Sequence, residues 1–188
     1  MDKIRCSWAE SDPLYIKYHD KEWGKPVKND QKLFAMLQLE GMQAGLSWIT
    51  ILKKRDAITE AFANFDPKKL ERYTLKKCDS LLQNENIIRS KAKIRAVVNN
   101  AKIFNVHFSK KGSFRDFLWG FVNNQPIVNR PKKLADIPTQ TESSAAMAKA
   151  LKKLGFSFVG PTICYAFMQA TGMVDDHVQS CYLSERGS

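Results

Sequence analysis

The sequence predicts an all-α protein. Apolar residues recur at helical spacing through most of the chain, whereas the alternation typical of strands is almost absent. Of the 188 residues, 44% are hydrophobic and 11% are aromatic, so the chain can bury a sizeable core and is not a disordered segment. We expect a single domain over residues 1–188, built of two helical lobes.

Residues 33–52, LFAMLQLEGMQAGLSWITIL, form the first long apolar run. The run is long enough to raise the question of a membrane span. It contains Glu40, two glutamines and two glycines, which argue against a span. We therefore expect a buried helix–turn–helix here and no membrane contact.

A second helix is predicted over residues 90–104, SKAKIRAVVNNAKIF. Its apolar residues repeat at helix spacing and its other face carries lysine and arginine. The segment 123–140, NNQPIVNRPKKLADIPTQ, has three prolines and no period, so it is expected to be a loop.

Two helices are predicted near the C-terminus. Thr139 and Glu142 have the spacing of a capping box, which would open a helix that runs to about Leu154. Pro161 suits the first turn of the next helix, and Gly172 is a natural stop for it.

The charge of the chain indicates a class of partner. Thirty lysines and arginines against 19 acidic residues give a net charge of +11. Such an excess favours a polyanion, most often nucleic acid, although a merely soluble basic surface would look the same. The N-terminus, MDKIRCSWAESDP, lacks the apolar run of a signal peptide, so we expect a cytoplasmic protein with reduced cysteines.

The segment DDHVQSC near the C-terminus suggests half of a metal site. On a helical turn His177 and Cys181 would share one face. A structural zinc ion takes four ligands, and Cys6 and His19 complete a Cys2His2 set. Because four protein ligands leave no open position for water, such a zinc would be structural. Chance spacing of the four residues is the alternative.

The zinc would join the two terminal segments, residues 6–19 and 177–181, into a clamp. The remaining cysteines and histidine are interpreted differently. Cys78 and Cys164 fall in helical patterns and are expected to be small buried residues. His107 is expected on the surface at a helix end.

Glu40 is the one ionisable side chain of the run 33–52. A carboxylate among apolar neighbours is costly without a partner, and functional carboxylates often lie in such places. The alternative is a helix-end glutamate that faces solvent. The aromatic residues near it in sequence are Trp8, Tyr15, Tyr18, Trp23 and Trp48. Rings of this kind can stack on bases and attract a cationic one, although some of them will only pack in the core.

The segment LKKLGFSFVGPTICYAFMQATGMVDDH predicts a helical hairpin whose turn contains glycines. Backbone N–H groups at Gly160 and at the start of the following helix can bind a phosphate, because that end of a helix is electropositive. Lys152 and Lys153 lie just before the turn. An ordinary helical hairpin would look similar apart from the glycines.

Four segments in order closely resemble the 3-methyladenine DNA glycosylase I family. They are YHDKEWG (18–24), LEGMQAGLSWITILKKR (39–55), FLWGFVN (117–123) and GFSFVGPTICYAFMQATGMVDDH (155–177). The resemblance covers essentially the whole chain and is weakest at 124–140. It implies a helix-hairpin-helix glycosylase fold with a zinc ion joining the N- and C-terminal segments. The implied zinc ligands are Cys6, His19, His177 and Cys181.

The resemblance also implies roles for individual residues. The residues that it assigns to the base pocket as catalytic are Tyr18, Glu40 and Trp48, with Trp8, Tyr15 and Trp23 as the lining. The residues that it places on the DNA are Gly45, Leu46, Gly155, Gly160 and Thr162. Leu46 resembles the residue that wedges into the duplex, and the hairpin resembles the phosphate anchor.

The implied activity is DNA repair by a monomer acting on double-stranded DNA. The enzyme would flip 3-methyladenine out of the duplex and hydrolyse its glycosidic bond, leaving an abasic site without strand cleavage, since no lysine nucleophile is assigned. Glu40 would accept hydrogen bonds from the cationic base, Tyr18 would add a polar contact and Trp48 would stack. The competing functions are a zinc-stabilised DNA-binding protein without catalysis and a glycosylase for other alkylated purines.

Asp175 has two interpretations. It could face the sugar and stabilise an oxocarbenium-like transition state, as carboxylates do in glycoside hydrolysis. It could instead cap a turn or orient His177 from behind the zinc. We favour the second, because a cationic leaving group needs less help.

Overall fold

The computed structural model describes residues 3–184, and the chain is helical through most of that length, as predicted. The α-helices are α1 (Pro13–Lys21), α2 (Asp30–Gln43), α3 (Trp48–Ala61), α4 (Pro67–Leu70), α5 (Leu75–Leu81), α6 (Lys91–His107), α7 (Ser113–Trp119), α8 (Glu142–Lys153) and α9 (Pro161–Ala170). The short 3-10 helices are η1 (Ser7–Ser11), η2 (Ala63–Phe65), η3 (Gly120–Val122) and η4 (Leu134–Asp136). None of the helices in this described part is long and apolar enough to cross a membrane.

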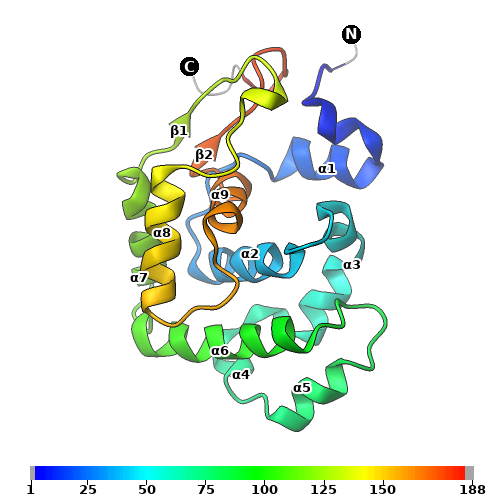
Figure 1. Ribbon diagram of the computed structural model, residues 1–188, viewed down its shortest axis with the longest axis vertical. Helices are drawn as coiled ribbons and strands as arrows, with labels where there is room; N and C mark the ends of the chain where they lie inside the picture. The colour runs from blue at the N-terminus through cyan, green and yellow to red at the C-terminus, as the bar shows by residue number, and fades with distance from the viewer. Residues whose placement is uncertain (1–2, 185–188) are drawn as a thin grey trace.

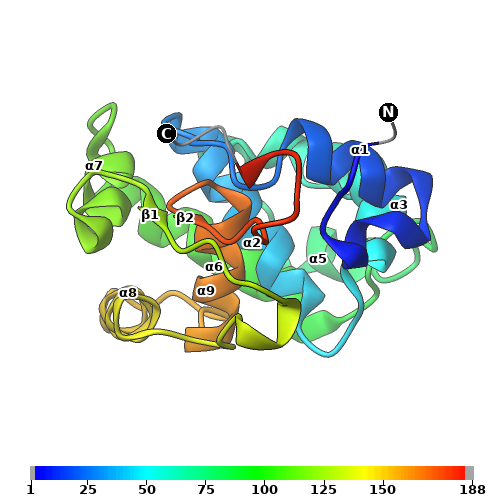
Figure 2. The same cartoon turned by 90° about the horizontal axis from the view of Figure 1, so that it is seen from above.

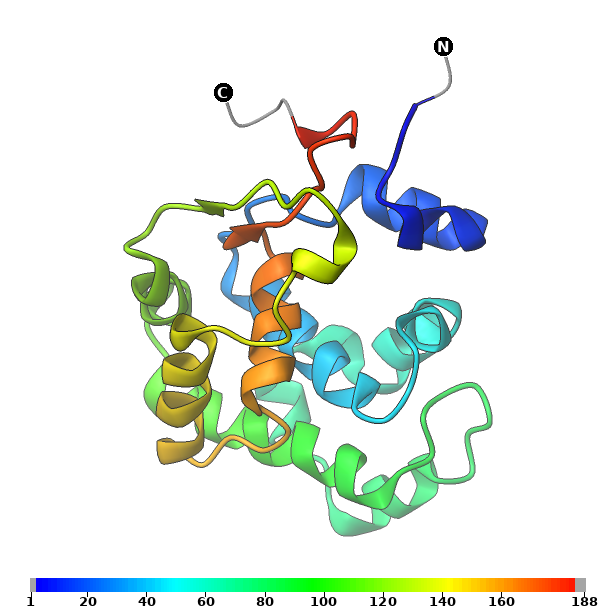
Figure 3. The same cartoon turned by 45° about the horizontal axis from the view of Figure 1, so that its top comes forward.

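Helix α9 lies at the centre of the molecule (Figure 1). It packs against α8 on one side and α2 on the other, and α6 runs across the end of this group. Helices α1 and α3 lie together at the right of the molecule in Figures 1 and 3, with α9 nearer the centre. The buried residues of α9 are Cys164, Tyr165, Phe167, Met168 and Ala170.

The predicted helix–turn–helix at 33–52 is confirmed. Helix α2 ends at Gln43, a four-residue turn follows, and α3 begins at Trp48. The side chain of Asn29 caps α2 by accepting a hydrogen bond from the Lys32 N–H at 3.0 Å. The Nζ atom of Lys93, on α6, donates to the carbonyl oxygens of Met42 and Ala44 at 2.9 and 2.5 Å. A lysine therefore satisfies carbonyl groups that the end of α2 leaves open.

The predicted cap of α8 was wrong by two residues. Thr141 is the N-cap, and its Oγ1 accepts from the Ser144 N–H at 3.2 Å, while the Thr141 N–H donates to the Ser144 Oγ at 2.9 Å. Ser144 is fully buried, so its hydroxyl takes the place expected for the exposed Glu142. The C-terminal end agrees with the prediction, since α8 ends at Lys153.

The predicted limits of α9 are confirmed, with Pro161 in its first turn and Gly172 just beyond its end. Gly172 has φ +66°, and a Cβ atom there would lie 2.3 Å from the carbonyl carbon of Lys25. Only glycine allows both this backbone conformation and this approach. The close contact brings the segment after α9 against the segment that precedes α2.

A short parallel pair of strands departs from the all-α prediction. Strand β1 (Ile127–Val128) pairs with β2 (Val174–Asp175), with Ile127 opposite Val174. Two-residue strands are too short for an alternating pattern to reveal them. The pair attaches the predicted loop 123–140, here called the strap, to the C-terminal segment.

The predicted helical turn in DDHVQSC was also wrong, because residues 176–178 have no regular structure and turns follow them. The Asp175 carboxylate accepts a hydrogen bond from the His177 N–H at 3.1 Å. A local bond of this kind offers the backbone an alternative to a helix. The C-terminal segment instead runs beside the N-terminal segment, as the red and blue chains in Figure 2 show.

Candidate active site and metal centre

A cavity of about 390 Å³ opens between α1, α2, α3, α9 and η4. Its lining residues are Trp8, Tyr15, Tyr18, Trp23, Glu40, Gln43, Trp48, Leu134, Ile137, Ala166 and Gln169. The six residues that the sequence suggested for a base pocket are therefore brought together around one cavity. This cavity is called the aromatic pocket below.

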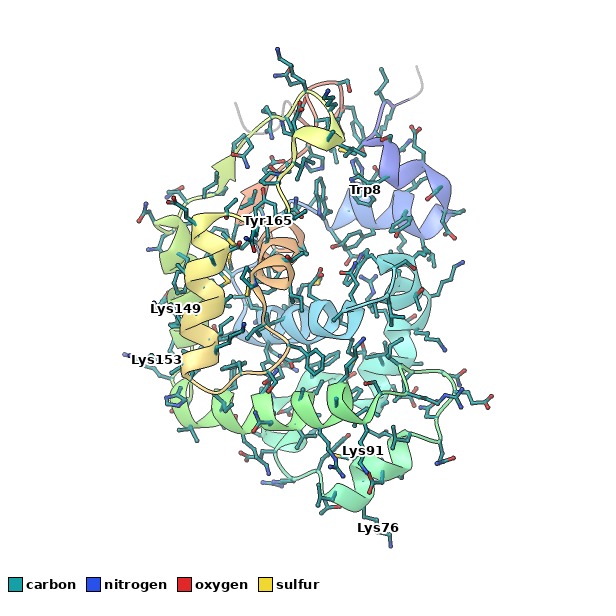
Figure 4. All side chains as sticks on the ribbon, viewed as in Figure 1. Trp8, Lys76, Lys91, Lys149, Lys153 and Tyr165 are labelled. Atoms are coloured by element: carbon teal, nitrogen blue, oxygen red, sulfur yellow. The ribbon has the colours of Figure 1, made fainter. Side chains whose placement is uncertain are left out.

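The rings of the aromatic pocket pack edge against face. Trp8, seen at the top of the molecule in Figure 4, lies 5.6 Å from Tyr15 and 5.1 Å from Trp23 between ring centroids, both at steep angles. The rings of Tyr18 and Trp48 are 5.4 Å apart. Such contacts hold rings rigidly, and the faces that they leave open can stack on a flat ligand.

Glu40 is buried in the wall of the aromatic pocket, with 3% of its surface exposed, so it is not a solvent-facing helix end. Burial raises the pKa of its carboxyl to about 8. Within the described residues, neither its Oε2 atom nor the indole nitrogen of Trp48 has a hydrogen-bond partner. A native protein rarely leaves buried polar atoms unpaired, so this pair of atoms indicates a ligand site.

The two tyrosines of the pocket differ in role. The Tyr15 hydroxyl accepts a hydrogen bond from the Ile49 N–H at 3.0 Å and so holds the first turn of α3. Tyr18 is buried, and burial, followed by the nearby Glu40, raises its pKa well above the usual value. Tyr18 therefore remains a neutral phenol.

The donor atoms of Cys6, His19 and Cys181 lie within 4.8 Å of one another, and all three residues are buried. The distance from His19 Nε2 to Cys181 Sγ is 3.5 Å. His177, the fourth predicted ligand, lies outside this group but beside it, with its ring centroid 5.1 Å from that of His19. Its Nε2 atom is buried and has no partner among the described residues.

The chemistry of these four residues fits a zinc ion. Burial raises the pKa of the Cys6 thiol to about 12, so a thiolate would need a cation beside it. Burial lowers the pKa of His19, which favours the neutral imidazole that a metal binds. The unpaired Nε2 of His177 supplies a further donor. Sulfur and imidazole donors of this kind are those of structural zinc sites.

Each histidine is held from behind by a carboxylate and an arginine. Asp20 accepts from His19 Nδ1 at 2.9 Å and forms a two-pronged ion pair with Arg5. Asp175 lies 2.6 Å from His177 Nδ1 and pairs with Arg130 of the strap at 2.9 Å. Burial opposes ionisation of Asp175, but the hydrogen bonds from His177 lower its pKa. Carboxylates in this position orient histidine ligands in metal sites.

The group formed by Cys6, His19, His177 and Cys181, here called the Cys/His cluster, lies directly behind one wall of the aromatic pocket. Trp23 lies 4.7 Å from the ring of His177, and Trp8 lies 5.4 Å from the ring of His19. Gly24 allows the first contact, because a Cβ atom there would lie 2.7 Å from His177 Cε1. Two of the tryptophans that line the pocket, Trp8 and Trp23, therefore pack directly on the two histidines.

Comparison with known proteins agrees with this geometry. The model of the Methyladenine glycosylase family matches residues 8–184. The chain belongs to the methyladenine glycosylase family. The DNA-3-methyladenine glycosylase of Haemophilus influenzae is 53% identical over 177 residues, which cover 94% of this chain and 96% of that protein.

Two solved methyladenine glycosylases have the same fold as this chain. The crystal structure of a 3-methyladenine DNA glycosylase I superposes with a TM-score of 0.93 at 50% identity, over 95% of this chain and 98% of that one. A structure described as the basis of 3-methyladenine recognition, from Staphylococcus aureus, superposes with a TM-score of 0.89 at 37% identity and covers 95% of both chains.

Asp175 does not line the aromatic pocket of this methyladenine glycosylase, in contrast to Glu40. Its carboxylate is engaged by His177 and Arg130. The residues expected on DNA lie outside the pocket. Leu46 is 40% exposed at the tip of the α2–α3 turn beside the exposed Gly45, and Gly155, Gly160 and Thr162 lie around the α8–α9 turn.

The lining residues that the sequence did not indicate are Gln43, Leu134, Ile137, Ala166 and Gln169. Gln43 follows Glu40 by three positions on α2, and helical spacing alone could have placed it there. Leu134 and Ile137 belong to the strap, which carries no periodic signal. The local sequence therefore gave no indication of these two residues.

Proposed function

We propose that this chain is a DNA repair glycosylase that removes 3-methyladenine from alkylated double-stranded DNA. The observation that carries the proposal is the unpaired Glu40 carboxyl and Trp48 indole N–H in a pocket walled by aromatic rings. A pocket of this kind suits a flat base flipped out of the duplex. The family and the activity for which its relatives are named support the same assignment.

The positive charge of 3-methyladenine in DNA explains how Glu40 would select it. With a pKa of about 8, the Glu40 carboxyl is mostly protonated near neutral pH. A cationic base favours the carboxylate form, gains an ion pair and stacks on Trp48. A neutral adenine gains none of this, so Glu40, Tyr18 and Trp48 together would favour the damaged base.

We infer that the reaction is hydrolysis without strand cleavage. The bond between the base nitrogen and C1′ of the sugar breaks, the cationic base leaves as a neutral molecule with the electron pair, water supplies the hydroxyl group of the abasic site, and the remaining proton of that water passes to solvent. No lysine is among the described residues that line the pocket, so the geometry offers no amine nucleophile. The cationic leaving group needs little further help.

The DNA-binding face would use two turns. The exposed Leu46 stands next to the pocket residues Gln43 and Trp48, where a wedge could fill the place of the flipped nucleotide. We assign the α8–α9 hairpin as a helix-hairpin-helix phosphate anchor. In support, the space beside Gly160 at the N-cap of α9 is open, and Lys149 and Lys153 project from α8 (Figure 4).

We further propose that Cys6, His19, His177 and Cys181 bind one structural zinc ion per chain. The zinc would hold the histidines against Trp8 and Trp23 and would not touch the base. Asp175 would orient the His177 ring through its hydrogen bond to Nδ1 and would not itself bind the zinc. Asp175→Asn is accordingly expected to reduce zinc retention, while excision by the zinc-loaded variant stays within a few-fold of the parent.

Chromatography of bases released from alkylated duplex DNA tests the proposed activity. Release of 3-methyladenine with the strands intact is the expected result, and Glu40→Gln should release less. DNA binding without release would support the noncatalytic alternative. Release of other alkylated purines in preference to 3-methyladenine would support a glycosylase for a different lesion.

A further inference from the structure

A second buried carboxylate lies behind the aromatic pocket. Asp176 is 1% exposed and does not line the pocket. It lies where α9, on which Figure 4 marks Tyr165, meets the C-terminal segment. Its Oδ2 atom accepts from the Tyr165 hydroxyl at 2.6 Å and from the Gln169 amide nitrogen at 2.7 Å, and its Oδ1 atom accepts from the Asn129 amide nitrogen at 2.7 Å.

These bonds fix the direction of every donor around Asp176. A carboxylate oxygen accepts hydrogen bonds, and the donors here are the Tyr165 hydroxyl and the amide nitrogens of Gln169 and Asn129. Burial and the bond to Asp176 raise the pKa of Tyr165 well above its usual value, so its phenol keeps the proton that it donates. Gln169 follows Tyr165 by four positions on α9 and presents its amide nitrogen from the same face.

The bond to Asp176 determines which atom Gln169 offers to the pocket. A side-chain amide carries its nitrogen and oxygen on one carbon, so an amide that points its nitrogen at Asp176 turns its oxygen elsewhere. Gln169 lines the aromatic pocket, and in the described part of the chain no hydrogen bond reaches its Oε1 atom. The Oε1 atom of this pocket-lining side chain is therefore free to accept a hydrogen bond.

We propose that Gln169 is a specificity-determining residue that accepts a hydrogen bond from the exocyclic amino group of an adenine base, and that Asp176 is its positioning residue. This inference rests on the proposed function and adds a means of selection that charge does not provide. Alkylated adenine and alkylated guanine can both be cationic in DNA. Adenine carries an amino group at C6, which can donate a hydrogen bond to the Gln169 oxygen. Guanine carries a carbonyl oxygen at the same position, and two acceptor oxygens would repel each other.

The test compares the affinity of two free bases, 3-methyladenine and 3-methylguanine, for the zinc-loaded protein. Quenching of the fluorescence of the pocket tryptophans measures binding. Gln169→Met keeps the length of the side chain and removes the acceptor. We expect the preference for 3-methyladenine to fall about tenfold, the size of one hydrogen bond, chiefly through weaker adenine binding. Gln83→Met, on the exposed surface, is the matched control and should leave both affinities unchanged.

Asp176→Asn tests the positioning residue separately. Its amide can donate as well as accept, so Gln169 would be free to turn its own nitrogen into the pocket. The preference for 3-methyladenine should fall in the same direction, with zinc content equal to that of the parent. A preference unchanged in Asp176→Asn but lost in Gln169→Met would refute the role of Asp176.

The remaining outcomes separate this inference from the proposed function. If Gln169→Met keeps the preference within about twofold, or weakens both bases equally, Gln169 does not determine specificity and the inference fails. If the parent protein binds neither base and releases none from alkylated DNA, the proposed function itself fails.

Discussion

Among single residues, Glu40 combines a position in the wall of the aromatic pocket with a cost in stability. Its folded-state pKa of about 8 is raised from an ordinary value of 4.5 by burial. The folded protein therefore holds a proton that the unfolded chain releases between these pH values. The contribution of Glu40 to the free energy of unfolding should be fully present below about pH 4.5 and should be lost as the pH rises toward 8.

Glu40→Gln is expected to remove this dependence, because glutamine resembles the protonated carboxyl and does not ionise. At pH 8 the variant should be more stable than the parent by a few kcal/mol, and near pH 4.5 the two should be similar. Thermal melts across this range measure the effect, with Glu60→Gln on exposed α3 surface as the control. Parallel melting curves for parent and Glu40→Gln would contradict the assignment of a buried, protonated Glu40.

Trp48 provides the second prediction at this scale. Trp48→Ala removes a stacking face and should weaken binding of free 3-methyladenine by about 1–3 kcal/mol. Trp48→Phe keeps a ring and should retain most of the affinity. Calorimetric titration of the three proteins decides the point, after circular dichroism has shown that each is folded. Equal affinity in Trp48→Ala and the parent would place the base elsewhere.

At the scale of elements, the α2–α3 turn depends on α6. Lys93 holds the carbonyl oxygens of Met42 and Ala44, so Lys93→Met should loosen the turn that carries Leu46. Excision from DNA should fall about tenfold, and stability should fall by about 1–2 kcal/mol, while affinity for the free base stays unchanged. Single-turnover excision and base titration measure the two effects.

Lys91→Met is the control for Lys93→Met, since it removes the same charge from an exposed position on the same helix. If both variants lose excision equally, general attraction of DNA and not the turn explains the result. If Lys93→Met also loses affinity for the free base, the turn shapes the pocket itself.

The elements also show what could be predicted from the sequence. The limits of α9 were predictable because the effects of Pro161 and Gly172 on the backbone are local and do not depend on tertiary contacts. The cap of α8 was not, because two threonines compete and the burial of Ser144 favours Thr141. The contribution of the strap to the pocket lining could not be predicted either, because it also depends on tertiary contacts. Leu134 reaches the pocket only because β1 pairs with a strand far along the chain.

The site was predictable to a similar extent. Glu40 stood out because a lone carboxylate in an apolar run is unusual, and the aromatic residues around it formed a recognisable group. Gln169 and Asp176 carried no such signal, since a glutamine on an amphipathic helix is ordinary. Their importance depends on a hydrogen bond between α9 and the segment after it, which only the folded chain displays.

For the molecule as a whole, the group formed by Cys6, His19, His177 and Cys181 is expected to couple stability to the shape of the pocket. Cys181→Ala should lower zinc content and melting temperature, and it should also weaken base binding, because Trp8 and Trp23 pack on the cluster histidines. Cys164→Ala removes a buried thiol outside the cluster and should keep the zinc. Elemental analysis with melting curves tests this. Protein purified without chelator and found to contain no zinc would refute the metal assignment.

The joining of the two terminal segments has a consequence for the speed of unfolding. His19 and Cys181 are 162 positions apart, so the contact between them closes a loop that contains most of the chain. Contacts across so long a loop are expected to form after the folding barrier, since closing the loop costs entropy before it gains anything. Interactions made after the barrier slow unfolding and leave the folding rate nearly unchanged. A bound zinc ion would therefore mainly lower the unfolding rate, so the lifetime of the native state would lengthen while the folding rate stayed nearly constant.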